Sequence, residues 1–490
     1  MKARELLELV LDAGSYASWD TPPAGPPADP GYAEQLATAA RDSGADEAVL
    51  TGAGTIRGRR VAVVACEFGF LAGSIGVAAA ERLVAAVERA TAERLPLLAA
   101  PVSGGTRMQE GTVAFLQMVK ISAAITLHKT AGLPYLVYLR HPTTGGVFAS
   151  WGSLGHVTVA EPGALIGFLG PRVYAELYGQ QFPPGVQVAE NLFRHGIVDA
   201  VLPPEAIPEI ADRALRVLCA GPVPLPAAPP TEALVDVPAW ESVTRSRDPA
   251  RPGVRRLLRV AATDVVPLNG TGEGETDPGL LLALVRFGEA ACVLLGQDRR
   301  GQSGEPMGPG ALREARRGMR LADELGIPLL TVIDTPGVAL SRQAEEGGVA
   351  GEIARCVSVL VTLGAPTLCL LLGEGTGGGA LALLPADRVI AAQHGWLSPL
   401  PPEGASVIVH RTVAQAPQLA AAQGVRSADL LRDGIVDRVV PERPDAAAEP
   451  DAFCRRVGQA VAYELAQLSG QQPADRYAAR LDRYRRIGRA

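Results

Sequence analysis

Residues 133–151, LPYLVYLRHPTTGGVFASW, place Gly145 and Gly146 directly after an apolar run. The run at 133–139 predicts a strand, and the small and aromatic residues after the glycines predict a buried helix. A glycine turn lets backbone N–H groups approach a ligand closely, and the start of a helix favours negative charge there. The stretch therefore predicts an oxyanion hole, or, as the alternative, a turn that only permits tight strand-to-helix packing.

The second half of the chain repeats this pattern, because residues 363–380 read LGAPTLCLLLGEGTGGGA. Gly146 and Gly379 are 379 − 146 = 233 positions apart, and Asp199 and Asp437 of the two GIVD motifs are 437 − 199 = 238 apart. Each half runs strand, helix, strand, loop, helix, strand, glycine turn, helix. This order predicts parallel strands joined by right-handed crossovers, and hence two similar α/β domains.

The domain boundaries follow from a proline-rich segment between the repeats. We predict an N-terminal domain at 1–219, an irregular linker at 220–252 and a C-terminal domain at 253–490. The N-terminal residues MKARELLELVLDAG predict a short amphipathic helix and do not have the pattern of a signal peptide.

Composition excludes several classes of function. The net charge is −6 without charged blocks, which disfavours nucleic-acid binding. The chain has three lysines, none after a glycine, so no Walker A loop is present. Its six cysteines form no CxxC pair, which predicts free thiols in a reducing cytoplasm and no metal site. No run reaches the ~20 apolar residues of a membrane span.

Two further motifs are weak. Gly373, Gly375 and Gly378 spell the GxGxxG of dinucleotide-binding folds, but the following helix is short and the next strand ends at Gln393 instead of an acid. The DTPG at 334–337 resembles a nucleotide-hydrolase motif, but there is no phosphate loop to accompany it.

Longer motifs carry a family resemblance. FGFLAGSIGVAAAERL, SGGTRMQEGTVAFLQ and AEPGALIGFLGPRV resemble the β subunit of the acetyl-CoA carboxylase carboxyltransferase, and IDTPGV, GEGTGGGALALL and SPLPPEGASVIVH resemble its α subunit. The match covers roughly residues 60–205 and 300–440. The chain therefore looks like both halves in one polypeptide, as in the actinobacterial acyl-CoA carboxylase β chains.

The resemblance implies two tandem crotonase-like domains of the ClpP/crotonase superfamily, built from ββα repeats, each with an oxyanion hole. One hole would hold the acyl-CoA thioester oxygen and the other the ureido oxygen of carboxybiotin. The catalytic residues implied are Gly145, Gly146, Gly379 and Ala380, and the substrate-binding residues implied are Gly104, Gly105, Thr106, Gly337, Val338, Gly378 and Ala382.

The activity implied is transfer of a carboxyl group from carboxybiotin to acetyl-CoA, or propionyl-CoA, to give malonyl-CoA or methylmalonyl-CoA for fatty acid biosynthesis. Both reactants become enolate-like, so no side-chain base is needed; His141 and His156 are expected to be structural. None of the lysines has the AMKM-like context of biotin attachment. The expected partners are a biotin carboxylase, a biotin carboxyl carrier protein and a second copy of the chain, in a homodimer or higher oligomer.

The sequence also departs from the family. The bacterial β subunit usually carries a four-cysteine zinc ribbon, which is missing from this sequence, and the residues after IDTPG are VALSRQ instead of the usual tyrosine, proline and glycine. Ala382 is the residue of the acetyl-specific α subunit. Two alternatives stay open: a decarboxylase of malonyl-type thioesters, and a non-catalytic carboxylase subunit. The two glycine turns argue against the latter.

Overall fold

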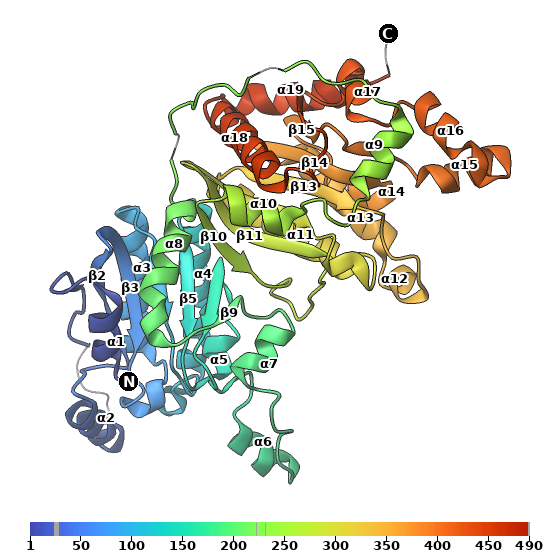
Figure 1. The fold of residues 1–490 in the computed structure, drawn as a ribbon. Coiled ribbons are helices and arrows are strands. Elements are labelled where there is room, and N and C mark those ends of the chain that lie inside the picture. Colours follow the sequence, from blue (N-terminus) through green and yellow to red (C-terminus); the bar gives the residue numbers. More distant parts are fainter. Residues whose placement is uncertain (24–28, 222, 231, 489–490) are drawn as a thin grey trace. The chain divides into compact units, whose positions relative to one another are not determined.

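The computed structural model describes residues 1–23, 29–221, 223–230 and 232–488. The chain divides into two compact units. The first contains Met1–Cys219 and Gly272–Gly274, and the second contains Ala220–Thr271 and Glu275–Ala490. Figure 1 shows that each unit has its own sheet with helices packed around it.

The first unit is built on a seven-stranded sheet. Its strands are β1 (Ala17–Ser18), β2 (Val49–Ile56), β3 (Arg59–Cys66), β4 (Leu97–Ala100), β5 (Tyr135–Leu139), β7 (Val157–Ala160) and β9 (Ala200–Val201), with β6 (Thr143–Thr144) and β8 (Ile166–Gly167) paired separately. Its helices are α1 (Ala3–Val10), α2 (Pro30–Ser43), α3 (Val77–Ala92), α4 (Gly111–Thr130), α5 (Gly145–Phe148), α6 (Pro171–Tyr178), α7 (Ala189–Arg194) and α8 (Ile207–Leu218).

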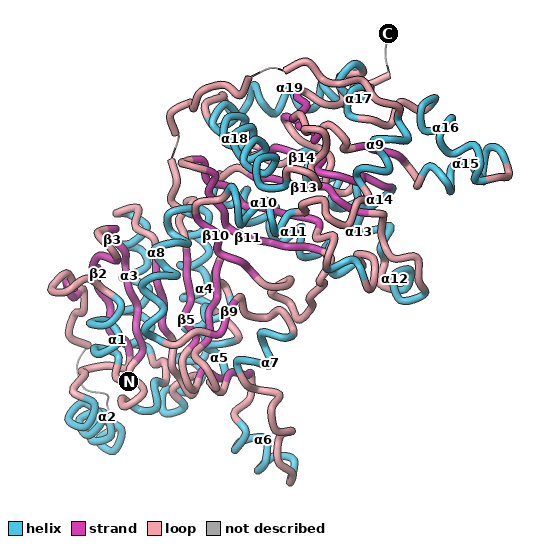
Figure 2. Tube along the Cα trace, in the orientation of Figure 1, coloured by secondary structure: helices cyan, strands magenta, loops and turns pink. Residues whose placement is uncertain are grey.

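The strand order in this sheet is β1-β2-β3-β4-β5-β7-β9, and every pair from β3 onward is parallel. β4 and β5 are buried along their whole length, as expected when helices cover both faces of a parallel sheet. The core contains the apolar sides of β3, β4, β5, α3 and α4. Figure 2 shows β3 and β5 within the first unit, and β4 pairs with both of them.

The second unit has an eight-stranded sheet of the same kind. Its strands are β10 (Asp264–Leu268), β11 (Leu280–Phe287), β12 (Ala290–Gln297), β13 (Leu329–Thr335), β14 (Thr367–Thr376), β15 (Arg388–Ala392), β16 (Trp396–Ser398) and β17 (Arg438–Val440). Its helices are α9 (Ala239–Ser246), α10 (Val254–Ala261), α11 (Pro309–Leu325), α12 (Arg342–Glu346), α13 (Val349–Thr362), α14 (Gly377–Leu381), α15 (Pro402–His410), α16 (Ala416–Ala422), α17 (Ser427–Arg432), α18 (Pro450–Ser469) and α19 (Pro473–Arg486).

The two units repeat one topology. The order β3-α3-β4-α4-β5-α5 in the first unit corresponds to β12-α11-β13-α13-β14-α14 in the second, and in both the strands of this segment are parallel. The prediction of two α/β repeats with parallel strands is confirmed, and the fold is crotonase-like.

The repeated GIVD motif has a structural explanation. The Asp199 carboxylate accepts a hydrogen bond from the N–H of Thr158 at 2.8 Å, and the Asp437 carboxylate accepts one from the N–H of Val389 at 2.7 Å. Thr158 is in β7 and Val389 is in β15, so each aspartate fixes the edge strand that follows it. The motif therefore stabilises the sheet in both units and is not catalytic machinery.

Two regions differ from the sequence-based expectations. The segment 220–252 contains a helix, α9, whose Val243 is fully buried against Trp396 and neighbouring residues. The expected linker is thus partly folded into the second unit.

One helical segment, Met108–Thr130, is long and apolar enough by length and composition to cross a membrane. Its helix α4 packs against α3 and buries Ile121 and Ile125, and its outer face is exposed.

Candidate active site

The first glycine turn joins β6 to α5. Gly145 has a φ of +64°, a left-handed conformation that strains any residue with a side chain. Its N–H donates to the Phe168 carbonyl at 2.9 Å. Because α5 begins at Gly145, the first N–H bonded within the helix is that of Phe148. The N–H groups of Gly146 and Val147 therefore have no acceptor among the residues that the structure describes.

A second turn packs directly against the first. Gly105 has a φ of +112°, and its N–H donates to the Ser103 hydroxyl at 3.0 Å. A Cβ placed on Gly145 would lie 3.2 Å from the Cα of Gly105, so the two turns touch through glycine backbone. The Thr106 hydroxyl would lie 3.2 Å from a Cβ on Gly146. The N–H of Gly104 donates to Ala72. The structure thus brings the predicted residues of the first unit together.

The second unit builds the same pair of turns. Gly337 has a φ of +131°, and its N–H donates to the Thr335 hydroxyl at 3.1 Å. Gly377 begins α14 with a φ of +63°. A Cβ on Gly379 would lie 3.2 Å from a side-chain carbon of Val338. The predicted residues Gly337, Val338 and Gly379 therefore also lie together, beside the start of α14.

The backbone conformations of the glycines change which residues of the two halves correspond to each other. Gly145 and Gly377 share their φ and their place at the start of a helix, and 377 − 145 = 232. Gly105 and Gly337 are also 232 apart, as are the hydroxyls of Ser103 and Thr335. The counterpart of Gly146 is therefore Gly378, and the spacing of 233 from Gly146 to Gly379 is wrong by one residue.

The backbone N–H groups that lack an acceptor also change which residues of the second turn are the candidate donors. Ala380 is the fourth residue of α14, so its N–H bonds to the carbonyl of Thr376 within the helix. The N–H groups of Gly378 and Gly379 are the ones without an acceptor in the described part of the chain. Ala382 is fully buried, with its N–H bonded to Gly378. The sequence-based reading missed Val147, whose place at the third helical position is the relevant signal.

The expected contribution of helix dipoles is not supported. α5 has four residues and α14 has five, whereas a dipole grows with the number of aligned peptide units. Negative charge at these turns would be stabilised by the individual N–H groups. Gly146 and Gly378 are both partly exposed, so a ligand can reach them.

Charged residues that the sequence-based reading missed support the second turn. Glu374 lies at the end of β14 and pairs with Arg247 at 3.3 Å, and Arg247 also pairs with Glu403 of α15 at 2.6 Å. Burial raises the pKa of the Glu374 carboxyl, and the Arg247 guanidinium opposes that shift. The Asp334 carboxylate of the DTPG motif accepts hydrogen bonds from Arg299 and from the Glu374 N–H. The motif therefore holds the end of β14 in place.

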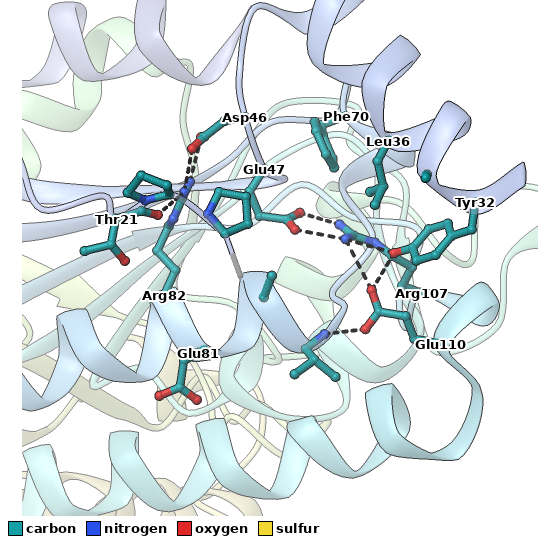
Figure 3. Close-up of a pocket in the computed structure, with 15 residues that line it drawn as sticks. Thr21, Tyr32, Leu36, Asp46, Glu47, Phe70, Glu81, Arg82, Arg107 and Glu110 are labelled. Atoms are coloured by element: carbon teal, nitrogen blue, oxygen red, sulfur yellow. Dashed lines mark hydrogen bonds and ion pairs between the residues drawn. The ribbon is translucent and has the colours of Figure 1, made fainter. Parts of the chain in front are cut away.

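A cavity of about 620 Å³ lies in the first unit, beside the residues that follow the Gly105 turn. Figure 3 shows Arg107 pointing at Glu47, and Tyr32 pointing at Glu110. Arg107 donates to Glu47, Ser74 and Tyr32, and all of its N–H groups are used. The cavity wall thus lacks a free Arg107 donor for an anion. The ion pair instead anchors the turn, because the backbone N–H of Arg107 donates to the carbonyl of Ile75.

The described residues contain no group of three or more His, Cys, Asp and Glu side chains that could hold a metal ion. The six cysteines are free, and burial raises the pKa of the Cys66 thiol to about 11. His141 and His156 both have hydrogen-bond partners in the backbone: His141 accepts from the Leu165 N–H and His156 from the Tyr135 N–H, both at 3.0 Å.

Known proteins resemble the chain along its whole length. The carboxyl transferase domain family matches residues 3–476. The probable biotin-dependent acyl-coenzyme A carboxylase beta3 subunit of Mycobacterium tuberculosis (strain ATCC 25618 / H37Rv) is 64% identical over 485 residues, which are 99% of this chain and 98% of that protein. The acetyl-coenzyme A carboxylase carboxyl transferase subunits beta/alpha of Salinispora arenicola are 36% identical, covering 100% of this chain and 91% of that protein.

Solved structures show the same fold. Transcarboxylase 12S, with hydrolysed methylmalonyl-coenzyme A bound, aligns with a TM-score of 0.74 at 21% identity and covers 96% of this chain and 90% of its own. A single-chain, multi-domain long-chain acyl-CoA carboxylase aligns with a TM-score of 0.72 at 20% identity, covering 93% of this chain and 45% of that chain.

Proposed function

The chain belongs to the carboxyl transferase domain family, and on that premise we propose that it is the carboxyltransferase subunit of a biotin-dependent acyl-CoA carboxylase. The observation that carries the proposal is the repeated turn. Each unit presents two adjacent N–H groups that have no acceptor among the described residues, at positions 146 and 147 and again at 378 and 379. Two substrates that each develop negative charge on an oxygen need such a pair each.

The donors act on two different oxygens in this proposal. The N–H groups of Gly146 and Val147 stabilise the thioester oxygen of acyl-CoA as its α-carbon loses a proton and gains the carboxyl group. Those of Gly378 and Gly379 stabilise the ureido oxygen of the biotin from which that group departs. Carboxybiotin, held on a separate carrier protein, supplies the activated carboxyl group. Removing one donor from such a hole typically lowers the rate by ~10²–10³.

We place the acyl-CoA thioester on the first unit and biotin on the second, as the family resemblance implies. Acetyl-CoA or propionyl-CoA is the proposed acceptor, and the cytoplasm, where both are available with a reduced thiol pool, is the proposed location. Ala382 favours acetyl-CoA by resemblance alone. Its side chain is fully buried at the end of α14, so no exposed contact supports that preference.

Exposed apolar residues support a homodimer or larger homo-oligomer. On α4 they include Phe115 and Val119, which are 60% and 67% exposed, and on α15 they include Ile408 and Val409, which are 60% and 58% exposed. Large apolar faces of this kind mark interaction surfaces. We propose that the first unit of one protomer faces the second unit of its mate. Native mass spectrometry at micromolar concentration should give at least a dimer, and monomer alone would contradict this.

The function is tested in the reverse direction with purified protein. Malonyl-CoA or methylmalonyl-CoA is incubated with free biotin or a biotinylated carrier, and loss of the thioester's carboxyl group is followed. We expect loss only when biotin is present. Equal loss without biotin would instead indicate a decarboxylase, and no loss with any thioester of the panel would contradict an active subunit.

A further inference from the structure

A second cavity, of about 240 Å³, lies in the second unit where α10 begins. Of its lining residues, one is acidic, Asp298, whereas six are arginines. The arginines are Arg251, Arg255, Arg256, Arg259, Arg299 and Arg300. We call these residues the arginine pocket. No part of the glycine turns lines it, so it requires its own explanation.

Four of these arginines are neutralised by neighbouring acids. Arg255 pairs with Asp298 at 2.6 Å, Arg256 with Asp451 at 2.9 Å, Arg251 with Glu442 at 2.7 Å and Arg299 with Asp334 at 2.8 Å.

The other two, Arg259 and Arg300, are exposed and form no ion pair with any residue that the structure describes. Six arginines set against the four acids that pair with them leave two arginines without an ion-pair partner in the described part of the chain. That excess suits a ligand with two negative charges.

Backbone donors add to this charge. α10 begins after Gly253, and the N–H groups of Gly253, Val254 and Arg255 have no acceptor within the described ranges of the chain. The Nε of Arg251, whose side chain is 1% exposed, also has no hydrogen-bond partner. Unpaired N–H groups at the start of a helix, together with guanidinium groups, are the usual means of holding a phosphate.

The pocket occupies the edge of the sheet where ligands of parallel α/β folds bind. Asp298, Arg299 and Arg300 directly follow β12, and a Cβ on Gly253 would lie 3.9 Å from the Asp334 carboxylate at the end of β13. The glycine turn that begins α14 follows β14 at the same edge of the sheet. Binding at the carboxyl ends of the strands is the general rule for such sheets.

We propose that the arginine pocket binds a phosphate ester or diphosphate. A phosphate ester carries close to two negative charges and matches the two unpaired arginines, whereas a single carboxylate does not. The cavity is too small for a folded partner. Two sources share this chemistry. One is the nucleotide end of an acyl-CoA whose thioester lies on the first unit of the partner protomer, which rests on the proposed function and its dimer; the other is a free phosphorylated effector, which does not.

The test uses the full-length double variant Arg259→Gln with Arg300→Gln, and Arg485→Gln on α19 as the control. All three arginines are exposed and form no ion pair with a residue that the structure describes, so the melting temperatures should stay close to wild type. Binding of adenosine 3′,5′-bisphosphate and of pyrophosphate is measured by calorimetry. Loss of two charge-assisted contacts should weaken binding by about tenfold to hundredfold. The control should bind like wild type.

Kinetics distinguish the two sources. If the ligand is acyl-CoA, the double variant should raise the KM for malonyl-CoA about tenfold and leave the KM for malonyl-pantetheine, which lacks phosphates at that end, unchanged. If the ligand is a free effector, both KM values stay unchanged while probe binding falls. Either result supports the pocket. Wild-type binding of both probes by the double variant, or no binding by the wild-type protein, overturns it. Probe binding requires no turnover, so a failure of the proposed function would be seen separately.

Discussion

Replacing Gly146 by valine tests the oxyanion hole proposed for the first unit. A Cβ at this position would lie 3.2 Å from the Cγ of Met118 and 3.2 Å from the Thr106 hydroxyl, both of which are side-chain atoms that can shift. Overpacking of this size costs about 1–3 kcal/mol, which a domain with a stability of 5–15 kcal/mol survives. The γ-methyl groups, however, crowd the partly exposed turn where the thioester oxygen has to approach the Gly146 and Val147 N–H groups.

We therefore expect carboxyl transfer to fall by at least ~10²-fold while the protein remains folded, because a donor pair that cannot reach its oxygen is equivalent to a donor removed. Gly470→Ala is the control, since its Cβ meets atoms at an ordinary 3.6 Å. Transfer from malonyl-CoA to biotin measures activity, and urea unfolding measures stability. Turnover within a few-fold of wild type, with a normal unfolding midpoint, would refute the assignment of the turn.

Three further predictions concern stability and composition. Glu47→Gln should destabilise the first unit by about 1–3 kcal/mol, because it removes the nearer of the two carboxylates that pair with Arg107, 1% exposed, and leaves only Glu110 at 3.6 Å. A loss below 1 kcal/mol in urea unfolding would contradict this. Burial lowers the pKa of His128 from 6.5 to about 4, so as the pH falls His128 is protonated in the unfolded chain before it is protonated in the folded one. Stability should fall, by at most ~1.4 kcal/mol per pH unit, as the pH drops from 6.5 towards 4, and His128→Gln should reduce that slope. Elemental analysis should find no stoichiometric zinc, and one zinc per chain would show that the scattered cysteines had been misread.

Much of the fold was predictable because apolar runs of strand length alternate with helical patterns in both halves. The register of the repeat could not be predicted, because residues 377–379 are three consecutive glycines. Only their backbone conformations tell them apart. A φ of +63° singles out Gly377 as the counterpart of Gly145. The role proposed for the Val147 N–H was equally hidden, because it depends on the residue where α5 begins and not on the type of side chain.

Charged residues far apart in the sequence were the other part that pattern could not reveal. Arg247 lies in a segment read as an irregular linker, yet it pairs with Glu374, which is 127 positions later. Burial of α9 against the second unit brings the pair together. The arginine pocket is hidden for the same reason, since Arg299 and Arg300 follow β12 whereas other arginines of the pocket lie on α10, far earlier in the sequence.

The surroundings of the two turns explain why backbone suffices for this chemistry. The Gly145 N–H is bonded to Phe168, and the carbonyl of Gly146 accepts from Ser150 at 2.5 Å. In the second unit, the carbonyl of Gly379 accepts from Gln297 at 2.7 Å. The neighbouring polar groups are thus fixed within the protein, and the adjacent N–H groups have no acceptor among the residues that the structure describes, which leaves them for the incoming oxygen of the proposed function. Such donors need no reorganisation when an enolate forms, so the turns can stabilise its oxygen without a titratable side chain.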